Sequence, residues 1–376
     1  MKLKSDFFFI IFVLNFSFIQ SQITDFKTKF ELPKEVNETS GLLFFDGKII
    51  THNDSGDSAN LYEIDSLSGN LLRTIQINNA TNVDWEDIAE DENHIYIGDF
   101  GNNNGNRKDL KIYKILKSDF KNSNSVSAEE ITFFYEDQNN FNNSNNHNFD
   151  AEAFVIYENS ILIFTKNWGN FKTNVYKIPL TIGNHKAIFV SFADVQGLIT
   201  GATLLNNNFI LCGYNSVAIP FIIYISSDRN TGDDIFNSGF EKHTLQNELD
   251  QGSQVEAITS FDNGKFYLSR EAVNNNVVNL PQKLFEFKDD RTKTLSVNNN
   301  DLTDFKISPN PTFGKLIIQS KEKINSIIIY NILGKKVLSV NKLQKKIDIS
   351  NFRKGIYFLQ IEFKDKKTLT KKIIKL

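Results

Sequence analysis

The chain has 376 residues, a formal net charge of −3 and 40% hydrophobic residues, enough for more than one packed domain. Its single cysteine, Cys212, excludes an intramolecular disulfide and a cysteine-based metal cluster, and its apolar neighbours predict a buried thiol. The charge is uneven: residues 305–376 hold 17 Lys and Arg against 4 Asp and Glu, a net +13, so the first 304 residues carry −16. So acidic a main part argues against nucleic acid as a partner.

The N-terminus is typical of a Sec signal peptide. Lys2 and Lys4 precede an apolar run over residues 7–18, which ends in a polar Gln-Ser-Gln sequence. This run of 12 residues is shorter than the roughly 20 residues that a membrane-spanning helix needs. We therefore predict a signal peptide over residues 1–21, cleaved after Ser21, and no transmembrane helix in the mature form. A buried N-terminal strand or helix is the alternative.

Five similar units follow over residues 22–288. Each begins with a hairpin in which two short apolar runs flank a polar turn, and the hairpins open at Ser40, Glu86, Glu152, Thr200 and Glu256. Since 216 residues separate the first position from the last, the units recur every 54 residues on average. A third strand centred on an aromatic residue follows each hairpin, and a fourth strand follows in four of the units. Four strands per unit at this spacing are typical of β-propeller blades.

The fifth unit lacks a fourth strand, whereas an unassigned strand over residues 26–32 precedes the first unit. We predict that this strand pairs with the strand near Leu284, because closing the ring removes two edges with unpaired backbone groups. The predicted fold is thus all-β. It comprises a five-bladed β-propeller over residues 22–288, a linker over 289–304 and a small C-terminal β-sandwich over 305–376. A six-bladed ring and a large β-sandwich are the alternatives for the main part.

Polar side chains should converge where the first strand of each blade begins and the second strand ends. The acids expected there as candidate metal ligands are Asp84, Glu86, Asp150, Glu152 and Glu256. Candidates for contact with another ligand on the same face are Asp99, Lys166, Arg270 and Glu271. The oxygen-rich loop of residues 53–57 brings Asp54 to this face as well. Carboxylates that converge need a cation, a basic neighbour or a shifted pKa, and Ca²⁺ prefers such oxygen ligands. Acids that cap turns, or a catalytic acid and base, are the alternatives.

The sequences Asp-Trp-Glu-Asp-Ile-Ala at residues 84–89 and Phe-Tyr-Leu-Ser-Arg-Glu at 266–271 resemble secreted propellers of the NHL, SdiA-regulated and phytase-like esterase type. These families include calcium-binding and phosphoester-cleaving members and proteins without known activity. Ser40 and Thr200 interrupt the ring of acids, and no catalytic set is recognisable. We therefore expect a binding protein for a glycan, a peptide or an envelope component. The alternative is a Ca²⁺-dependent hydrolase, a phosphoesterase or a lactonase, that acts through these acids with Arg270 or Lys166.

The basic C-terminal segment carries a series of motif residues: Pro309, Asn310, Pro311, Gly314, Tyr330, Asn331, Gly334, Gly355, Tyr357, Lys371 and Lys372. Together they resemble the type A sorting domain of proteins that leave the cell through the type IX secretion system. Six alternating strands between residues 315 and 374 predict the small β-sandwich.

This resemblance implies two kinds of partner and a route out of the cell. The domain would be recognised by the type IX secretion machinery and removed by its C-terminal signal peptidase, with cleavage in the linker. Sec export would deliver the chain to the periplasm, and the mature protein would be secreted or held at the outer-membrane surface. Attachment to surface lipopolysaccharide is one expected outcome.

Overall fold

The computed structural model describes residues 23–226, 234–237, 239–274, 278–292, 306–320, 323–332, 334–340, 346–363 and 368–376. The predicted signal peptide, and the predicted linker from residue 293 onward, lie outside these residues. The chain divides into two compact units, residues 1–294 and 295–376. No described helix is long and apolar enough to span a membrane.

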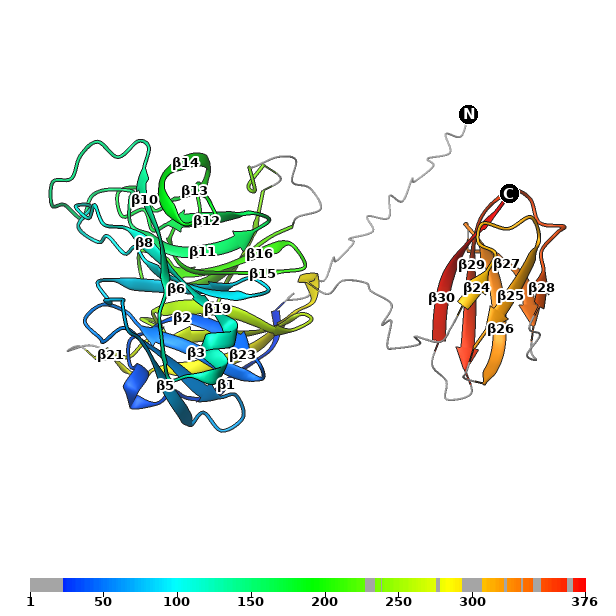
Figure 1. Cartoon of the computed structure of the whole chain (residues 1–376), viewed down its shortest axis with the longest axis horizontal. Helices are drawn as coiled ribbons and strands as arrows, with labels where there is room; N and C mark the ends of the chain where they lie inside the picture. Colours follow the sequence, from blue (N-terminus) through cyan, green and yellow to red (C-terminus); the bar gives the residue numbers. More distant parts are fainter. Residues whose placement is uncertain are drawn as a thin grey trace, which may run out of the picture. The chain divides into compact units, whose positions relative to one another are not determined.

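The first unit consists of antiparallel four-stranded blades (Figure 1). Blade 1 contains β2 (Thr39–Phe45), β3 (Lys48–Asn53), β4 (Asn60–Asp65) and β5 (Leu71–Ile77). Blade 2 contains β6 (Trp85–Glu90), β7 (His94–Asp99), β8 (Lys111–Leu116) and β10 (Glu129–Tyr135). Blade 3 contains β11 (Ala151–Tyr157), β12 (Ser160–Thr165), β13 (Thr173–Pro179) and β14 (Gly183–Ala193). Blade 4 contains β15 (Leu198–Leu205), β16 (Asn208–Tyr214), β17 (Pro220–Ile225) and β18 (Glu241–Thr244). Blade 5 contains β19 (Val255–Asp262), β20 (Lys265–Arg270), β23 (Lys283–Asp289) and β1 (Ile23–Glu31).

The blades form a closed ring. Their innermost strands contact one another in the cyclic order β2, β6, β11, β15, β19 and again β2. β1 pairs antiparallel with β23, and Phe30 lies opposite Leu284. The predicted five-bladed propeller, closed by its N-terminal strand, is therefore confirmed, and the described residues of this first unit form neither a sixth blade nor a large β-sandwich.

Apolar cores fill the junctions between neighbouring blades. The middle strands lie between two blades, so both of their faces are buried, as in β16, where every residue is buried. Runs of β-branched and aromatic residues suit such strands because both faces pack against apolar neighbours. Cys212 is a buried free thiol in the core that blades 4 and 5 share, as predicted.

Two outer pairings were not predicted from the sequence. The short strand β9 (Ser125–Val126) extends blade 1 by parallel pairing with β5. The first half of β14 pairs parallel with β10 of blade 2, and its second half pairs antiparallel with β13. The remaining short elements of this unit are η1 (Lys34–Val36), α1 (Lys117–Asn122), β21 (Val273–Asn274), β22 (Asn279–Leu280) and η3 (Asp290–Thr292). In η3, Arg291 forms ion pairs with Asp289 and Glu241, so the propeller unit continues past Lys288.

The second unit is the predicted small β-sandwich. One sheet consists of β24 (Lys306–Ser308), β25 (Lys315–Gln319) and β28 (Lys346–Asp348). The other sheet has the order β27 (Lys336–Val340), β26 (Ile324–Asn331), β29 (Gly355–Phe363) and β30 (Thr368–Lys375). Apolar residues that alternate along these strands form one core between the sheets. The six predicted strands correspond to β25 through β30.

Candidate functional site

One end of the propeller ring carries a cluster that we call the acidic mouth: Asp54, Asp84, Glu86, Asp150, Glu152, Glu256 and Glu271, together with Lys166. These residues lie where the first strand of a blade begins and the second strand ends. Backbone hydrogen bonds close this end of blades 1, 3 and 5, from Asp54 N to Glu38 O (2.9 Å), Lys166 N to Asp150 O (2.7 Å) and Glu271 N to Gln254 O (3.2 Å). The repeated register therefore places equivalent positions of different blades around one opening.

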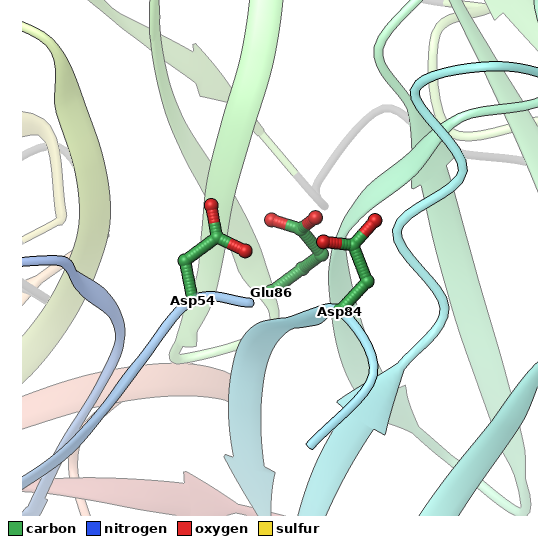
Figure 2. Close-up of side chains that lie close together, drawn as sticks. All are labelled: Asp54, Asp84 and Glu86. Atoms are coloured by element: carbon green, nitrogen blue, oxygen red, sulfur yellow. The ribbon is translucent and has the colours of Figure 1, made fainter. Parts of the chain in front are cut away.

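Asp54, Asp84 and Glu86 turn their carboxylates toward one another (Figure 2). One oxygen from each lies within 4.8 Å of the other two. Two ionised carboxylates at that separation repel by roughly 3 kcal/mol at an effective dielectric constant of 20. Three oxygens bound to one Ca²⁺ at about 2.4 Å would be at most about 4.8 Å apart. The spacing of this triad is therefore compatible with a shared hard cation.

The triad is tightly enclosed on one side. Glu86 is buried, and its Oε1 has no hydrogen-bond partner among the described residues. A Cβ atom on Gly101 would lie 2.0 Å from Glu86 Oε1 and 2.5 Å from Asp84 Oδ2, so only glycine fits beside these two carboxylates. A buried oxygen without a partner is costly, and a bound cation would satisfy it.

Burial and neighbouring negative charges both raise the pKa values of the carboxyl groups in the triad. Burial, followed by the charges of Asp54 and Asp150, raises the pKa of Asp84 to about 7. Burial, followed by the charges of Glu152 and Asp54, raises the pKa of Glu86 well above its usual value. The basic groups Lys166 and Arg107 favour ionisation of Asp54 and Asp84 from a distance. Both form their ion pairs elsewhere, with Glu152 and Asp99.

The acids of the mouth outside the triad have a basic neighbour, Lys166. Lys166 is buried, and its Nζ lies 3.1 Å from Glu152 Oε1. The same ammonium lies 5.1 Å from the ring centre of Trp168 and 5.7 Å from that of Tyr214. Burial by itself lowers the pKa of Lys166, but electrostatic interactions with Glu152, Tyr214 and Glu256 raise it well above its usual value. Lys166 thus remains charged and balances the carboxylates around it.

The remaining acids of the mouth differ in their surroundings. Burial raises the pKa of Glu256 well above its usual value, with Lys166 opposing this shift and Glu271 adding to it. Burial, followed by the charge of Asp54, raises the pKa of Glu271 to about 7. Asp150 instead has fixed partners, because its Oδ1 accepts from Asn102 N (2.6 Å) and its Oδ2 from Trp168 Nε1 (2.7 Å). Asp150 was predicted as a metal ligand. In the structure its two carboxylate oxygens hold the loops of Asn102 and Trp168 together.

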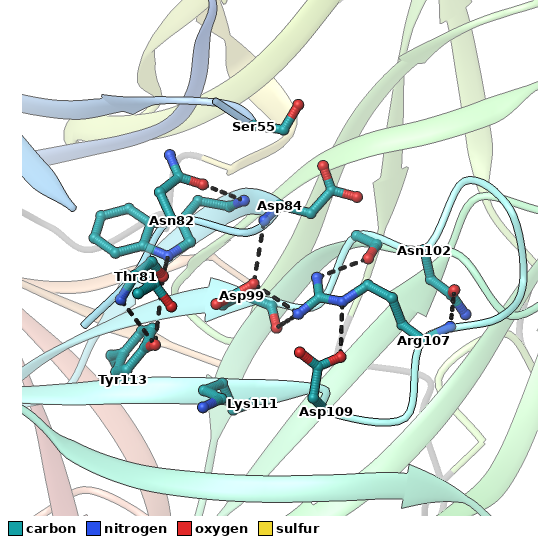
Figure 3. Close-up of polar contacts among 12 residues, drawn as sticks. Ser55, Thr81, Asn82, Asp84, Asp99, Asn102, Arg107, Asp109, Lys111 and Tyr113 are labelled. Atoms are coloured by element: carbon teal, nitrogen blue, oxygen red, sulfur yellow. Dashed lines mark hydrogen bonds and ion pairs between the residues drawn. The ribbon is translucent and has the colours of Figure 1, made fainter. Parts of the chain in front are cut away.

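Asp99, a predicted ligand-face residue, holds the backbone of Asp84, one member of the triad (Figure 3). It is fully buried, and its Oδ1 accepts from Asp84 N at 3.2 Å and from Arg107 Nη2 at 2.9 Å. Arg107 also donates to Gly101 O (2.9 Å) and to Asp109 Oδ1 (3.1 Å). The Asp99–Arg107 pair thus fixes both Asp84 and Gly101, and Arg107 is used inside the protein rather than offered to an anionic ligand.

Arg270, another predicted ligand-face residue, points elsewhere. Its side chain is 2% exposed and donates to Pro281 O (3.0 Å) and Ser253 Oγ (2.9 Å). Its guanidinium carbon lies 5.6 Å from the ring centre of Phe285, inside blade 5. The structure therefore brings Glu271 into the mouth but not the guanidinium of Arg270.

The two non-acidic hairpin positions have structural partners. Ser40 Oγ donates to Glu86 O (2.6 Å), and Thr200 Oγ1 donates to Val255 O (2.6 Å). Each hydroxyl thus joins its innermost strand to that of the next blade in the ring.

Sequence reasoning missed Gly101 and Tyr214 and did not group Asp54 with the metal ligands. Tyr214 ends β16, so the rule that placed Lys166 at the end of a second strand would have found it in blade 4. No sequence pattern marks Gly101, because its role depends on how closely the carboxylates of Glu86 and Asp84 approach it in the folded protein.

Comparison with known proteins identifies the C-terminal unit. Residues 306–376 match the model of the secretion system C-terminal sorting domain. No curated protein matches the chain.

Several solved structures are similar at low identity. PorZ, a surface component of the type-IX secretion system of Porphyromonas gingivalis, is 11% identical with a TM-score of 0.36. That match covers 90% of this chain but 45% of PorZ, so this chain spans less than half of that protein. A putative oxidoreductase (glucose dehydrogenase) from Thermus thermophilus is 7% identical, with a TM-score of 0.41, over 70% of this chain and 99% of the other. A putative gluconolactonase is 7% identical, with a TM-score of 0.38, over 72% of this chain and 93% of the other.

The sequence motifs, the β-sandwich and the family match agree for the C-terminal unit. Residues 306–376 are therefore a secretion system C-terminal sorting domain, and the propeller before them is cargo of the type IX secretion system.

Proposed function

We propose that the mature propeller is a binding protein whose acidic mouth holds a Ca²⁺-like cation and, with it, a glycan, a peptide or an envelope component. The observation that carries this proposal is the triad of Asp54, Asp84 and Glu86. Its oxygens lie within 4.8 Å of one another, and the buried Glu86 Oε1 has no partner among the described residues. Lys166 pairs with Glu152 in the same mouth, whereas none of the ion pairs among the described residues involves a carboxylate of the triad.

Charge limits the class of ligand. The mouth contains seven carboxyl groups and one ammonium, so a single divalent cation leaves it acidic or partly protonated. A neutral polyol or a cationic group fits such a surface, whereas a free anion would be repelled. Carboxyl groups near a partly exposed Trp168 also suit a sugar, which combines hydroxyl groups with an apolar ring face.

Calorimetric titration of the propeller with CaCl₂ tests the cation site. We expect one Ca²⁺ per chain, and a rise in melting temperature of roughly 5–10 °C at a free Ca²⁺ concentration 100-fold above Kd. Asp84→Asn and Glu86→Gln should each weaken binding roughly tenfold or more, because the number of charged ligands sets the affinity. Gly101→Ala should do the same by pushing the two carboxylates apart.

Glu256→Gln is the matched control, since it removes an acid of the same mouth outside the triad. It should retain most of the affinity for Ca²⁺. Equal losses of Ca²⁺ affinity in Glu256→Gln and Asp84→Asn would mean that binding depends only on the overall negative charge of the mouth. Absence of any Ca²⁺ effect on the wild-type melting temperature would contradict the proposal.

A Ca²⁺-dependent hydrolase of phosphoesters or lactones is the second candidate. It is favoured by Glu271, whose pKa of about 7 suits a general base at neutral pH. Under this alternative, Glu271→Gln would abolish turnover of a phosphoester or lactone while Ca²⁺ binding is retained. Equal turnover by wild type and Glu271→Gln would count against it.

The place of action follows from the sorting domain. We propose that the propeller is released from the cell or attached to surface lipopolysaccharide after the C-terminal signal peptidase removes the domain. Fractionation of cells that express the full chain, followed by mass spectrometry of the C-terminus of the mature form, distinguishes the two.

A further inference from the structure

Several motif residues of the sorting domain are engaged in building it. Asn310 covers the edge of β30, since its Nδ2 donates to Lys372 O (2.8 Å) and its Oδ1 accepts from Ile374 N (2.9 Å). Two backbone bonds continue this cover, from Thr312 N to Ile374 O (2.8 Å) and from Leu376 N to Thr312 O (2.9 Å). The backbone groups bonded in this way, at the C-terminal end of the edge strand, are not free to pair with a partner.

The turn motifs have the same kind of role. Asn331 Oδ1 accepts from Lys335 N at 3.0 Å, and Gly334 adopts a φ of 74°, which glycine tolerates. The hydroxyl of Tyr357 donates to Arg353 O (2.9 Å). These motif side chains stabilise the fold, so exposed residues next to the motifs are candidates for the surface that is recognised.

An exposed groove lies on the three-stranded sheet of this domain. It has a volume of about 740 Å³ and is lined by the outward side of β25, by β28 and by the segment around Phe313. Phe313 is 82% exposed and Ile317 is 40% exposed. Leu316 and Ile318 point into the core, so alternation along β25 leaves Ile317 in the groove. Large apolar side chains exposed together typically mark an interaction surface.

The charge around the groove indicates the partner. Lys315 and Lys346 line it and are exposed, and the sequence of the domain carries a net +13. Asp348 also lines it, but its carboxylate accepts from Ser350 N at 2.8 Å. A surface with an apolar centre and basic edges complements an acidic protein surface that offers an apolar side chain.

We propose that the secretion machinery docks in this groove, with an apolar side chain against Phe313 and Ile317 and acidic groups near Lys315 and Lys346. The domain has to be recognised for the chain to be sorted, and this groove combines exposed apolar side chains with the charge that an acidic partner requires. The proposal concerns the sorting domain alone and is independent of the acidic mouth.

Export of the full chain, in a bacterium that has the type IX secretion system, tests this docking site. We expect the double variant Phe313→Ala/Ile317→Ala to reduce the surface and medium fraction at least fivefold and to accumulate in the periplasm. Lys315→Glu/Lys346→Glu should give the same defect through charge alone. These lysines are exposed, so the domain should fold when they are replaced. If the apolar variant fails to fold, the lysine variant therefore still tests the docking site.

Ile356→Ala/Phe358→Ala is the matched control, because these residues are 42% and 40% exposed on β29 of the other sheet. This control should be exported within twofold of wild type. Wild-type export of both groove variants would overturn the proposal, as would an equal defect in the control. Export of groove variants with the sorting domain still attached would also overturn it, because the groove would then serve the peptidase.

Discussion

Lys166 is the residue on which the charge balance of the mouth depends most directly. Replacing it by Met would leave the buried carboxylates of Glu152 and Glu256 without their ammonium. We expect the free energy of unfolding to fall by about 3–5 kcal/mol, the usual cost of breaking a buried ion pair on one side. Added Ca²⁺ should recover part of this loss by entering the vacated position, and calorimetry should then show a second bound ion.

The matched control is Lys111→Met. Lys111 pairs with Glu130 at 3.3 Å, but the two side chains are 22% and 38% exposed, so water screens the pair. Its loss should cost less than about 1 kcal/mol. Equal unfolding free energies for Lys166→Met and Lys111→Met, measured in urea, would show that the mouth tolerates uncompensated acids.

Asp84 and Glu271 make the cation-free protein sensitive to pH. Both have a pKa of about 7 in the folded state, well above the usual value near 4 of an exposed carboxyl group. Between these values the folded state binds more protons than the unfolded state. The free energy of unfolding should therefore fall as the pH rises from about 4 to about 7.

Urea unfolding of wild type and Asp84→Asn, at pH 5 and pH 7.5 in EDTA, measures this effect. The decrease should be smaller in Asp84→Asn, because residue 84 no longer titrates. Ca²⁺ must displace the protons of the triad, and the ionisation of Asp84 alone should raise its affinity about tenfold between pH 6 and pH 8, with any further rise coming from Glu86. An affinity independent of pH would argue against Asp84 as a ligand.

At the scale of single elements, β1 determines whether the ring closes. It supplies the outer strand of blade 5, and Ile23 and Leu32 bury their side chains at the junctions with blades 4 and 1. Removing residues 22–32 should lower the free energy of unfolding by about 5 kcal/mol or more, since each large buried side chain contributes about 1.5–3 kcal/mol. A synthetic peptide of residues 22–32 should restore part of this stability. Unchanged unfolding of the truncated chain would mean that the ring does not need β1.

Hairpins and outer strands differ in how far sequence predicts them. In each blade the hairpin pairs neighbouring runs across a short turn, so local alternation and turn residues were enough to place it. The parallel pairing of β14 with β10 joins residues about 50 positions apart, and no local pattern specifies such a contact. The same limit applies to β9 and β5.

At the scale of the whole molecule, both ends of the propeller lie away from its mouth. β20 runs toward the mouth and ends at Arg270, next to Glu271. β23 runs back antiparallel to β20, and Ile23 lies opposite Asp289 at its far end. The chain therefore enters and leaves blade 5 at the end opposite to the acidic mouth.

Because the chain leaves blade 5 at this end, we expect cation binding not to depend on the sorting domain. Residues 23–292 and the chain with its sorting domain should bind Ca²⁺ with affinities that agree within about twofold, as measured by calorimetry. The +13 of residues 305–376 makes the comparison sensitive to any contribution from the domain. A large gain or loss of affinity after truncation would show that the domain reaches the mouth.

The order of amino acids was sufficient to predict the five blades, their closure by residues 26–32, and the sorting domain. These features rest on local alternation, turn residues and motifs that recur along the chain. The sequence also placed acids at one end of the ring, because strand direction fixes which residues share an end. Which of these acids face one another was decided only by the tertiary structure. Glu86 meets Asp54 and Asp84 beside Gly101, Asp150 is held by Trp168, and Arg270 turns into blade 5, because side-chain contacts across blades depend on distances of a few ångströms that no spacing in the sequence specifies.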